Sequence, residues 1–247
     1  MARERAQEPY GQSFEGDRRL HPRFWDADYC LLRSLADAVD AFAAEYVKPG
    51  MTVVDLGCGA KPYRRLFPID CKYIGVDACQ NPHADMVVLP GQPVALPNAI
   101  ADCIVSTQVV YLVPDYGSYL RECRRLLRPG GKMFVTTHGT WTYHPASGGD
   151  YYRFTQDGLR HIMREAGFCI EAISPVVGTL GTGLHLRQLV FNSWLRHLPL
   201  GRAIAILLNI ATNARIVVED RFSPAGTRMA SPVIFTAIAH LESLDGQ

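Results

Sequence analysis

Val53-Val54-Asp55-Leu56-Gly57-Cys58-Gly59-Ala60 is the stretch of sequence that decides the fold. It begins inside a short apolar run, Met51 to Leu56, of the kind that forms a buried parallel strand. Gly57 and Gly59 carry no Cβ, so a ligand can approach their backbone closely. Asp55 adds a negative charge at the end of the strand, which suits a nucleotide-like ligand with a cationic amino group. We expect a strand, a glycine-rich turn and a following helix, with the ligand contacting Asp55, Gly57, Cys58 and Gly59.

A second acidic residue supports this interpretation. Asp77 ends the next apolar run, 22 residues after Asp55. An acidic residue about 20 positions beyond a glycine-rich turn is placed to accept hydrogen bonds from ribose hydroxyls. Taken singly, the glycines could form a tight turn without a ligand, and Asp77 could be an ordinary turn residue. In a strand–turn–helix–strand context they favour a nucleotide site, with Ala78 beside Asp77.

The rest of the chain alternates between apolar runs and segments of helical periodicity. Expected strands cover residues 51–56, 72–76, 84–89, 101–106, 132–137, 168–173 and 232–239. Expected helices cover residues 31–47, 115–127 and 155–167, with Asp115 and Thr155 as N-caps. Such alternation predicts a mainly parallel sheet covered on both faces, with ligands bound beyond the carboxyl ends of the strands.

Several motifs resemble those of one enzyme family. Asp55-Leu56-Gly57-Cys58-Gly59, Gly75-Val76-Asp77 and Arg128-Pro129-Gly130-Gly131 are similar to motifs of class I S-adenosylmethionine-dependent methyltransferases, in particular methyltransferase type 11. The resemblance covers roughly residues 26–175. It implies an α/β fold with a Rossmann-like seven-stranded sheet, the last strand antiparallel, and S-adenosylmethionine as cofactor. The cofactor domain would span residues 26–247 after a flexible tail, 1–25, with a helical cap, 178–230, inserted between strands six and seven.

The sequence departs from the family pattern in two places. Many relatives carry Leu-Glu-His after strand four, where this chain has Val110-Tyr111-Leu112. The acidic residue often found after strand three, near the adenine, is also not evident. We therefore expect the adenine against backbone and apolar atoms between Pro93 and Leu96, including Val94. Gln108, just past strand four, is expected to line the methionine end of the cofactor.

The segment after the fifth expected strand is rich in groups suited to catalysis. His138 and His144 are candidate general bases, because imidazole titrates near neutral pH. A structural histidine and a surface histidine are the alternatives, since positioning alone can accelerate methyl transfer. Arg153 could bind an acidic acceptor or pair with Asp150 or Asp157 instead. The predicted substrate-binding residues are Trp141, Tyr143, Tyr152 and Arg153, with loop or core packing as the alternative for the aromatic ones.

Composition restricts the partners. The formal net charge is +1, so no strong basic field favours nucleic acid. Seven cysteines, an odd number, and a polar N-terminus favour a cytoplasmic protein without disulfides. Cys79 and His83 are half a metal site without a second pair, so no metal is expected. Residues 203–214 are too short to span a bilayer, which favours a buried or cap helix, although an interfacial helix and peripheral membrane association stay open.

These observations favour methyl transfer to a small molecule, with an oxygen acceptor on a glycan or secondary metabolite. A nucleotide-dependent oxidoreductase is the first alternative, although Pro62 stands where a dinucleotide fingerprint has its third glycine. A module that binds S-adenosylmethionine without turnover is the second. Methylation of nucleic acid or protein ranks low because no basic stripe is present. The oligomeric state is left open.

Overall fold

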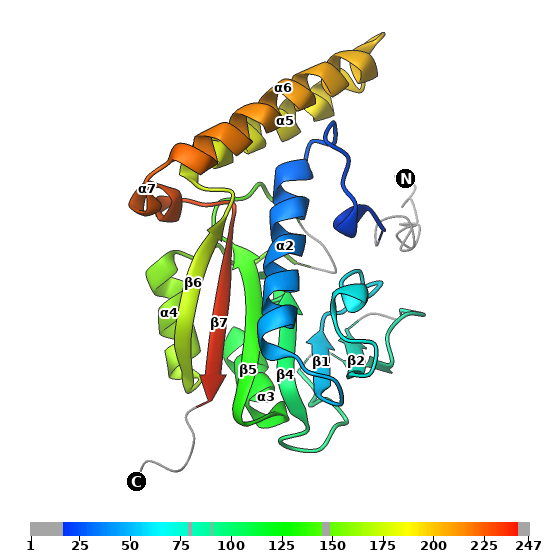
Figure 1. The fold of residues 1–247 in the computed structure, drawn as a ribbon, viewed down its shortest axis with the longest axis vertical. Coiled ribbons are helices and arrows are strands. Elements are labelled where there is room, and N and C mark those ends of the chain that lie inside the picture. The colour runs from blue at the N-terminus through cyan, green and yellow to red at the C-terminus, as the bar shows by residue number, and fades with distance from the viewer. Residues whose placement is uncertain (1–16, 79–80, 90, 145–148, 242–247) are drawn as a thin grey trace, which may run out of the picture.

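A seven-stranded sheet with the order β3-β2-β1-β4-β5-β7-β6 forms the centre of the protein (Figure 1). The computed structural model describes residues 17–78, 81–89, 91–144 and 149–241. β7 runs antiparallel to β5 and β6, and the other pairs are parallel, which confirms the predicted topology. The strands are β1 (Thr52–Leu56), β2 (Lys72–Asp77), β3 (Met86–Val87), β4 (Ala101–Thr107), β5 (Leu127–His138), β6 (Phe168–Val176) and β7 (Ile234–Leu241).

Helices cover both faces of the sheet because successive side chains of each strand point to opposite sides. Val53 and Phe134 pack with the apolar face of α2 (Tyr29–Tyr46). Val54 and Met133, one residue away on the same strands, pack with α3 (Tyr116–Leu126) and α4 (Gln156–Glu165). The continuous apolar runs therefore fill two cores at once, as expected for buried parallel strands.

Both predicted N-caps are confirmed. The Asp115 carboxylate accepts a hydrogen bond from the Ser118 N–H at 2.9 Å at the start of α3. The Thr155 hydroxyl oxygen accepts one from the Gly158 N–H at 3.0 Å at the start of α4. Each side chain satisfies a backbone donor that the first helical turn leaves without a partner.

The prediction of a helix directly after the glycine-rich turn is wrong. Only a 3₁₀ turn, η1 (Arg64–Leu66), lies between β1 and β2. Lys61 has a φ of 52°, and a residue before proline is disfavoured in the helical region, so Lys61-Pro62 delays helix formation. The strand expected over 84–89 is also shorter, with two residues in β3, whereas β5 is longer than expected and begins at Leu127.

The predicted insertion between β6 and β7 contains α5 (Thr179–Leu195), α6 (Gly201–Phe222) and the short α7 (Ala225–Ala230). α5 and α6 form a long hairpin at the top of Figure 1, beyond the carboxyl ends of β5 and β6. Residues 203–214, expected to form a short buried or cap helix, lie within the longer α6, and the buried alternative is wrong. α6 has 22 residues, and its most apolar window, long enough by composition to cross a membrane, is only 28% buried.

The N-terminal tail predicted for 1–25 is too long, as residues 17–25 are attached to the fold. Asn209 of α6 donates a hydrogen bond to the Trp25 carbonyl at 3.0 Å, and Asn213 donates one to the Phe24 carbonyl at 2.8 Å. The Arg18 guanidinium pairs with Asp28 at the start of α2. The rest of the predicted tail, 1–16, lies outside the described residues.

Candidate cofactor and substrate site

The candidate site lies at the carboxyl edge of the sheet, where β1, β2 and β4 end. β2 and β3 lie on one side of β1, and β4 and β5 lie on the other, so the strand order reverses beside β1. Ligands of open α/β sheets bind at this point of reversal, beyond the carboxyl ends of the strands. The glycine-rich turn therefore sits where the architecture favours a ligand.

The two glycines of the turn have different roles. Gly57 has a φ of +79°, and a Cβ added there would lie 2.3 Å from Cγ2 of Val109, so its missing side chain allows close packing with the end of β4. Gly59 has a φ of +50°, and a Cβ added there would meet no atom within 4 Å. The open space that a ligand could occupy is thus beside Gly59. Cys58 is buried with its sulfur near Gly75, so a contact of Cys58 with a ligand would involve its backbone, and its role in binding stays a prediction.

Asp77 connects the end of β2 to this turn. Its Oδ2 accepts a hydrogen bond from the Gly59 N–H at 2.9 Å and another from Nδ2 of Asn81 at 3.1 Å. The same Asn81 nitrogen donates to the Gly59 carbonyl at 2.5 Å. Ala78, the next predicted residue, is exposed. Sequence reasoning missed Asn81, whose only signal is an amide four residues after the acid that ends β2.

Asp55 is a buried carboxylate with an incomplete set of partners. Its side chain is 2% exposed, and the Tyr73 hydroxyl donates to Oδ2 at 2.6 Å. Oδ1 is buried and has no hydrogen-bond partner among the described residues. Burial raises the pKa of Asp55 to about 7, against the lowering effect of the Tyr73 hydrogen bond, and the charge of Asp77 raises it further. Such a group favours a cation or a strong donor beside it.

A second buried acceptor lies at the end of β4. Gln108 has a φ of +60° and is held by the Thr136 hydroxyl, which accepts from its N–H at 3.0 Å and from Nε2 at 2.9 Å. This arrangement fixes the side-chain amide and leaves Oε1 buried without a partner in the described part of the chain. Because an unsatisfied buried acceptor is unfavourable, Gln108 and Asp55 both fit a ligand that brings N–H donors to the ends of neighbouring strands.

His138 forms part of a column of rings and is poorly suited to be a general base. Its ring lies 4.0 Å from that of Tyr111 and stacks on Trp141 at 5.0 Å, and Trp141 stacks in turn on His185 of α5 at 5.3 Å. Burial, together with the charge of Arg153, lowers the pKa of His138 to about 3. A base this weak is mismatched to neutral pH, which favours the structural alternative, and the catalytic role of His138 stays a prediction. The column links the site to the α5–α6 hairpin.

Arg153 is used inside the loop and does not reach toward a substrate. Its Nη1 and Nη2 form a bidentate pair with the Asp150 carboxylate at 2.5 and 2.6 Å. Nη2 also donates to the Thr142 carbonyl at 2.8 Å. The ion pair with Asp150, one of the two alternatives, is therefore present, and it lowers the pKa of Asp150 to about 2. The donors of Arg153 are therefore used within the loop, and its substrate-binding role stays a prediction that these contacts do not favour.

We expect Arg153→Lys to destabilise the protein by about 2 kcal/mol, because one ammonium cannot replace the bidentate pair and the bond to a loop carbonyl. Urea denaturation measures this change. Arg164→Lys, at an exposed position of α4, is the control and should leave the unfolding midpoint unchanged. Equal midpoints for both variants would contradict the loop-closing role.

The other predicted loop residues divide into three groups. Tyr152 donates its hydroxyl to the Pro114 carbonyl at 2.7 Å and packs edge-on against Tyr116, which favours the packing alternative, and its substrate contact stays a prediction. Tyr143 and His144 are exposed, and their predicted substrate-binding and catalytic roles stay predictions. Trp141 is half-buried within the ring column, and its substrate-binding role stays a prediction.

The expected adenine contacts around Val94 are not supported. The Val94 N–H donates to Glu122 at 2.7 Å, and its carbonyl accepts from Arg125 at 2.9 Å. Arg125 also donates to the Leu96 carbonyl at 2.8 Å. The Val94 side chain is buried in the core. Its backbone groups and side chain are thus already used, which does not favour the adenine contact, and the cofactor role of Val94 stays a prediction.

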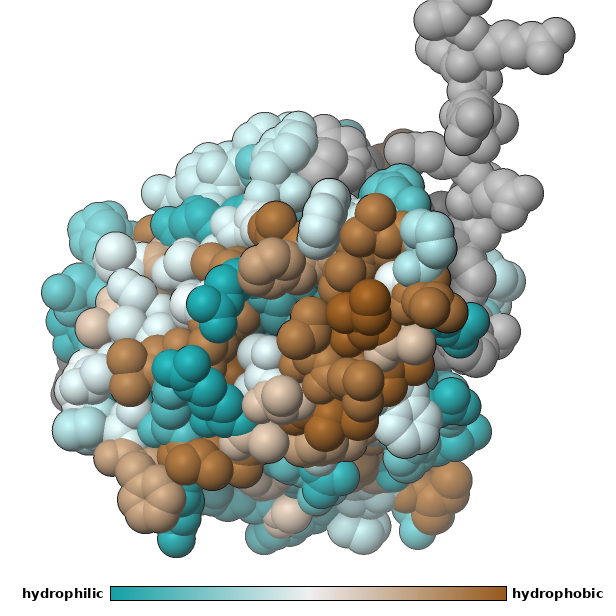
Figure 2. All heavy atoms as spheres, turned by 90° about the horizontal axis from the view of Figure 1, so that it is seen from above, coloured by the Kyte–Doolittle hydropathy of each residue, from teal (hydrophilic) through white to brown (hydrophobic). Residues whose placement is uncertain are grey.

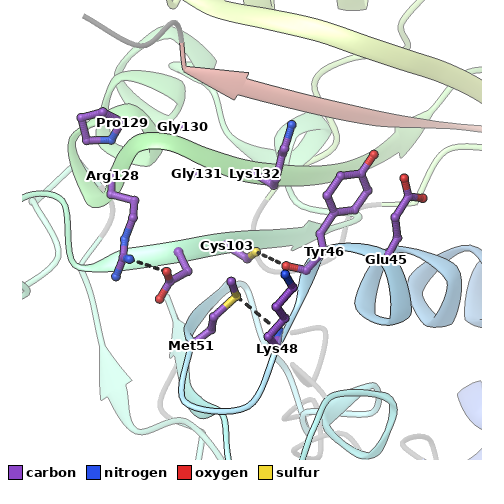
Figure 3. Close-up of a pocket in the computed structure, with 11 residues that line it drawn as sticks. Glu45, Tyr46, Lys48, Met51, Cys103, Arg128, Pro129, Gly130, Gly131 and Lys132 are labelled. Carbon is purple, nitrogen blue, oxygen red and sulfur yellow. Dashed lines mark hydrogen bonds and ion pairs between the residues drawn. The ribbon is translucent and has the colours of Figure 1, made fainter. Parts of the chain in front are cut away.

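A separate hollow of about 330 Å³ lies at the opposite edge of the sheet (Figure 3). It is lined by residues before β1 and β4 and at the start of β5, including Lys48, Met51 and Arg128. Arg128 pairs there with Asp102 at 2.5 Å, and Asp102 accepts from the Thr52 N–H at 2.7 Å. These contacts join strand beginnings, so we assign this edge to stability and not to catalysis.

No metal centre is found within the described residues. No three histidine, cysteine, aspartate or glutamate side chains come together there in a way that could hold an ion. Cys79, one member of the half site noted in the sequence, lies outside the described residues. The site described above consists of hydrogen-bonding and apolar groups.

Comparison with known proteins agrees with this geometry. Residues 27–173, more than half of the chain, match the methyltransferase domain family. The chain belongs to this family. The match begins just before α2 and ends within β6, so it contains the glycine-rich turn, Asp77, Gln108 and the ring column apart from His185.

The curated relatives match this chain over only part of their own length. A probable S-adenosylmethionine-dependent methyltransferase of Mycolicibacterium smegmatis is 29% identical over 145 residues, covering 49% of this chain and 53% of the relative. A ubiquinone biosynthesis O-methyltransferase of Caulobacter vibrioides is 31% identical over 103 residues, covering 36% and 41%. The human thiol S-methyltransferase TMT1B is 28% identical over 116 residues, covering 38% and 47%. The chain thus spans about half the length of the curated relatives it matches.

Solved structures share the fold at low identity. The [4+2]-cyclase SpnF superposes with a TM-score of 0.57 at 17% identity, covering 86% of this chain and 81% of the cyclase. A 1,6-didemethyltoxoflavin-N1-methyltransferase of Burkholderia thailandensis gives 0.53 at 14% identity, covering 97% and 93%. These similarities extend the fold assignment to the insertion between β6 and β7.

Proposed function

We propose that this protein transfers a methyl group from S-adenosylmethionine to a small-molecule acceptor, with oxygen as the acceptor atom. The observation that carries the proposal is a pair of buried acceptors, Asp55 Oδ1 and Gln108 Oε1, without donors among the described residues, at the ends of neighbouring strands beside an open glycine turn. The cofactor's ammonium group supplies N–H donors and a positive charge. Family membership and the names of the relatives, which include oxygen, sulfur and nitrogen methyltransferases, support the same reaction.

In this proposal different residues bind different parts of the cofactor. Asp55 and Gln108 bind the ammonium end, while Gly59 allows the adenosyl part to approach the backbone. Asp77 binds the ribose, with Asn81 holding both Asp77 and Gly59 in place. When bound, S-adenosylmethionine supplies an activated methyl group on a sulfonium. The chain then needs to place the acceptor in line with that methyl group and exclude water.

The ring column is the wall against which the acceptor is placed in this proposal. His138 is neutral, so it can donate or accept a hydrogen bond without adding charge near the sulfonium. Trp141 provides an apolar face beside it. In this proposal His144 or water accepts the proton of the acceptor, or no base is needed. Positioning of the acceptor contributes most of the rate acceleration.

The oxidoreductase alternative is weakened by local structure. Dinucleotide sites place the pyrophosphate on the N-terminus of the helix that follows the glycine-rich turn. Here a 3₁₀ turn of three residues follows, after Pro62, and no such helix lies between β1 and β2. Calorimetry with S-adenosylmethionine and with NAD separates the two proposals, and binding of NAD alone would overturn ours. Cofactor binding without methyl release on a broad acceptor panel would favour the non-catalytic module.

We expect Asp77→Ala to weaken S-adenosylmethionine binding at least about tenfold, because a hydrogen bond to a charged group contributes about 1.5–3 kcal/mol. The variant also loses the bond to the Gly59 N–H that fixes the turn. Isothermal titration calorimetry gives the affinity. Asp70→Ala removes an exposed carboxylate just before β2 and should bind the cofactor normally. Equal affinity of both variants would remove Asp77 from the proposed site.

A further inference from the structure

The outer surface of the α5–α6 hairpin is unusually apolar. Thirteen of the twenty exposed large apolar side chains in the described residues lie between 179 and 222. Phe191 and Trp194 of α5 and Leu207 and Leu208 of α6 are among them, and Leu200 in the turn is 82% exposed. Figure 2, which looks down on the hairpin, shows a continuous apolar area on this side of the protein. Soluble monomers rarely leave such a patch uncovered.

The two helices meet through polar groups. Nε2 of Gln188 on α5 donates to Oδ1 of Asn209 on α6 at 3.0 Å, and Nδ2 of Asn192 donates to the same oxygen at 2.7 Å. Asn213 is fully buried and donates to the Phe24 and Asp26 carbonyls, both at 2.8 Å. Apart from Leu184, Leu195 and Ile216, the large apolar side chains of the hairpin are outside and polar side chains join the helices, which is the reverse of a helix pair that packs in water.

The charges of the hairpin are mostly positive. Residues 179–218 include four arginines and no aspartate or glutamate, and the two acidic residues of α6, Glu219 and Asp220, lie at its far end, away from the turn between the helices. Arg196 and Arg202 flank the turn between the helices and line an open hollow of about 390 Å³ with Leu198 and Leu200. Both arginines are exposed. An apolar face with basic residues at its margin is the pattern of helices that lie on anionic lipid surfaces.

We propose that the outer face of the α5–α6 hairpin docks on an anionic lipid bilayer, with both helices in the plane of the interface. Trp194, 59% exposed, is placed at the depth where indole rings favour the boundary between acyl chains and headgroups. Arg196 and Arg202 contact lipid phosphates at the hairpin turn. Docking brings the carboxyl edge of the sheet close to the membrane, because the ring column connects His138 at the end of β5 with His185 of α5.

The contacts of α6 favour lying on the membrane over crossing it. A spanning α6 would have to leave α5 and carry Asn209 and Asn213 into hydrocarbon without their present partners. Unsatisfied polar groups are strongly unfavourable there. In the docked arrangement these bonds stay intact, and only side chains that are already exposed enter the bilayer.

Vesicle flotation of the full chain, without added cofactor, tests the proposal. Because the assay requires neither cofactor binding nor methyl transfer, a negative result would overturn membrane docking without overturning the proposed function. Vesicles of phosphatidylcholine mixed with phosphatidylglycerol should capture the protein, and pure phosphatidylcholine should capture much less. We expect Arg196→Glu/Arg202→Glu to lower the partition coefficient roughly 25-fold, from about fivefold for each arginine near an anionic surface. Leu207→Glu, at a position 69% exposed, should lower it at least about tenfold.

The matched control variants change exposed residues outside the hairpin. Ile69→Glu changes an apolar side chain that is 84% exposed, and Arg65→Glu/Arg164→Glu reverses two exposed arginines outside the hairpin. These variants should float like the unchanged protein. Capture that is equal for neutral and anionic vesicles, or equal for hairpin and control variants, overturns the proposal. So does a dimer in sedimentation velocity that Leu207→Glu dissociates while vesicles capture neither form, because the face is then an interface between two copies.

Discussion

Gly59→Leu should lower the affinity for S-adenosylmethionine at least about 100-fold while leaving a folded protein. Gly59 is the position of the turn where an added Cβ meets no atom within 4 Å, so a larger side chain extends into open space without displacing the protein. In the proposed function, that space holds the adenosyl part of the cofactor. Steric exclusion at a backbone contact removes binding and does not merely weaken one hydrogen bond. Isothermal titration calorimetry measures the loss.

The backbone conformation calls for a matched control. Gly59 has a φ of +50°, so leucine there costs about 1 kcal/mol in the left-handed region. Gly50 has a φ of +84° and also has no atom within 4 Å of an added Cβ, but it lies before β1 at the opposite edge of the sheet. Gly50→Leu should show a similar loss of thermal stability and normal cofactor binding. If the two variants bind equally well, the open space at Gly59 is not the cofactor site.

Gly57 is less suitable for this experiment, although the sequence places both glycines in one motif. Its added Cβ would lie 2.3 Å from the Val109 side chain, so any substitution moves the end of β4. Lost binding would then report on packing as well as on the site. This distinction between the glycines was not predictable from the sequence, because it depends on which strand end lies opposite each one.

The sheet was predictable for a simple reason. Buried strands such as Met133–Val135 and, apart from Asp55, Val53–Leu56 consist of apolar residues, and the continuous apolar runs that form them stand out in the sequence. Asp115 and Thr155 marked helix starts by a local hydrogen bond that needs no tertiary information. The missing helix after Gly59 depended on Lys61 and Pro62, whose local preference outweighed the expected strand–turn–helix pattern.

The site was predictable in part. Asp55, Gly59, Asp77 and Gln108 lie together at one sheet edge because strand ends converge there. The loop after β5 was harder, because its polar residues can bind each other as easily as a substrate. Arg153 is satisfied by Asp150 and loop carbonyls, and burial changes His138 from a candidate base into a neutral ring. The sequence offered both outcomes as alternatives, but residue type and spacing did not decide between them and the predicted roles.

The α5–α6 hairpin shows that helical periodicity alone does not decide which face of a helix is buried. Helical spacing identifies an apolar and a polar face, and the usual assumption places the apolar face inside. In α6 the buried side chains are Asn209, Asn213 and Ile216, and most of the apolar residues point outward. Arg202 and Arg215, which flank residues 203–214 in the sequence, are exposed positions within α6. The reversal follows from polar partners on α5 and before α2, which lie far away in the sequence.

Asp55→Asn should change stability and cofactor binding in opposite directions. The carboxylate is fully buried, and burial raises its pKa from 3.8 to about 7. A folded-state pKa above the unfolded value means that the stability contribution is present below about pH 4 and is lost as the pH rises through about 7. The shift corresponds to about 4 kcal/mol. Without cofactor, Asp55→Asn should therefore be more stable than the unchanged protein at about pH 8 and show little of this pH dependence.

Urea denaturation at about pH 5.5 and about pH 8 tests the stability part. Asp85→Asn is the control, because the Lys61 ammonium beside Asp85 holds the pKa of that carboxyl below its usual range, despite the opposing effect of burial. The lowered pKa of Asp85 contributes stability that is lost only as the pH falls through the folded-state pKa. Asp85→Asn should therefore still lose stability between about pH 5.5 and about pH 8, as the unchanged protein does. If Asp55→Asn loses as much stability over this range, the Asp55 carboxylate is not the cause.

Binding should respond in the opposite way because the cofactor brings a cation to Asp55. The ionised carboxylate is then favoured, so S-adenosylmethionine should bind more tightly as the pH rises toward about 7 and should displace a proton at about pH 6. Calorimetry in two buffers of different ionisation enthalpy counts that proton. Asp55→Asn should release none and should bind at least about tenfold more weakly at about pH 8. Equal proton release by both proteins would show that the cofactor's cation does not meet Asp55, and that the buried acceptor at the end of β1 serves another ligand.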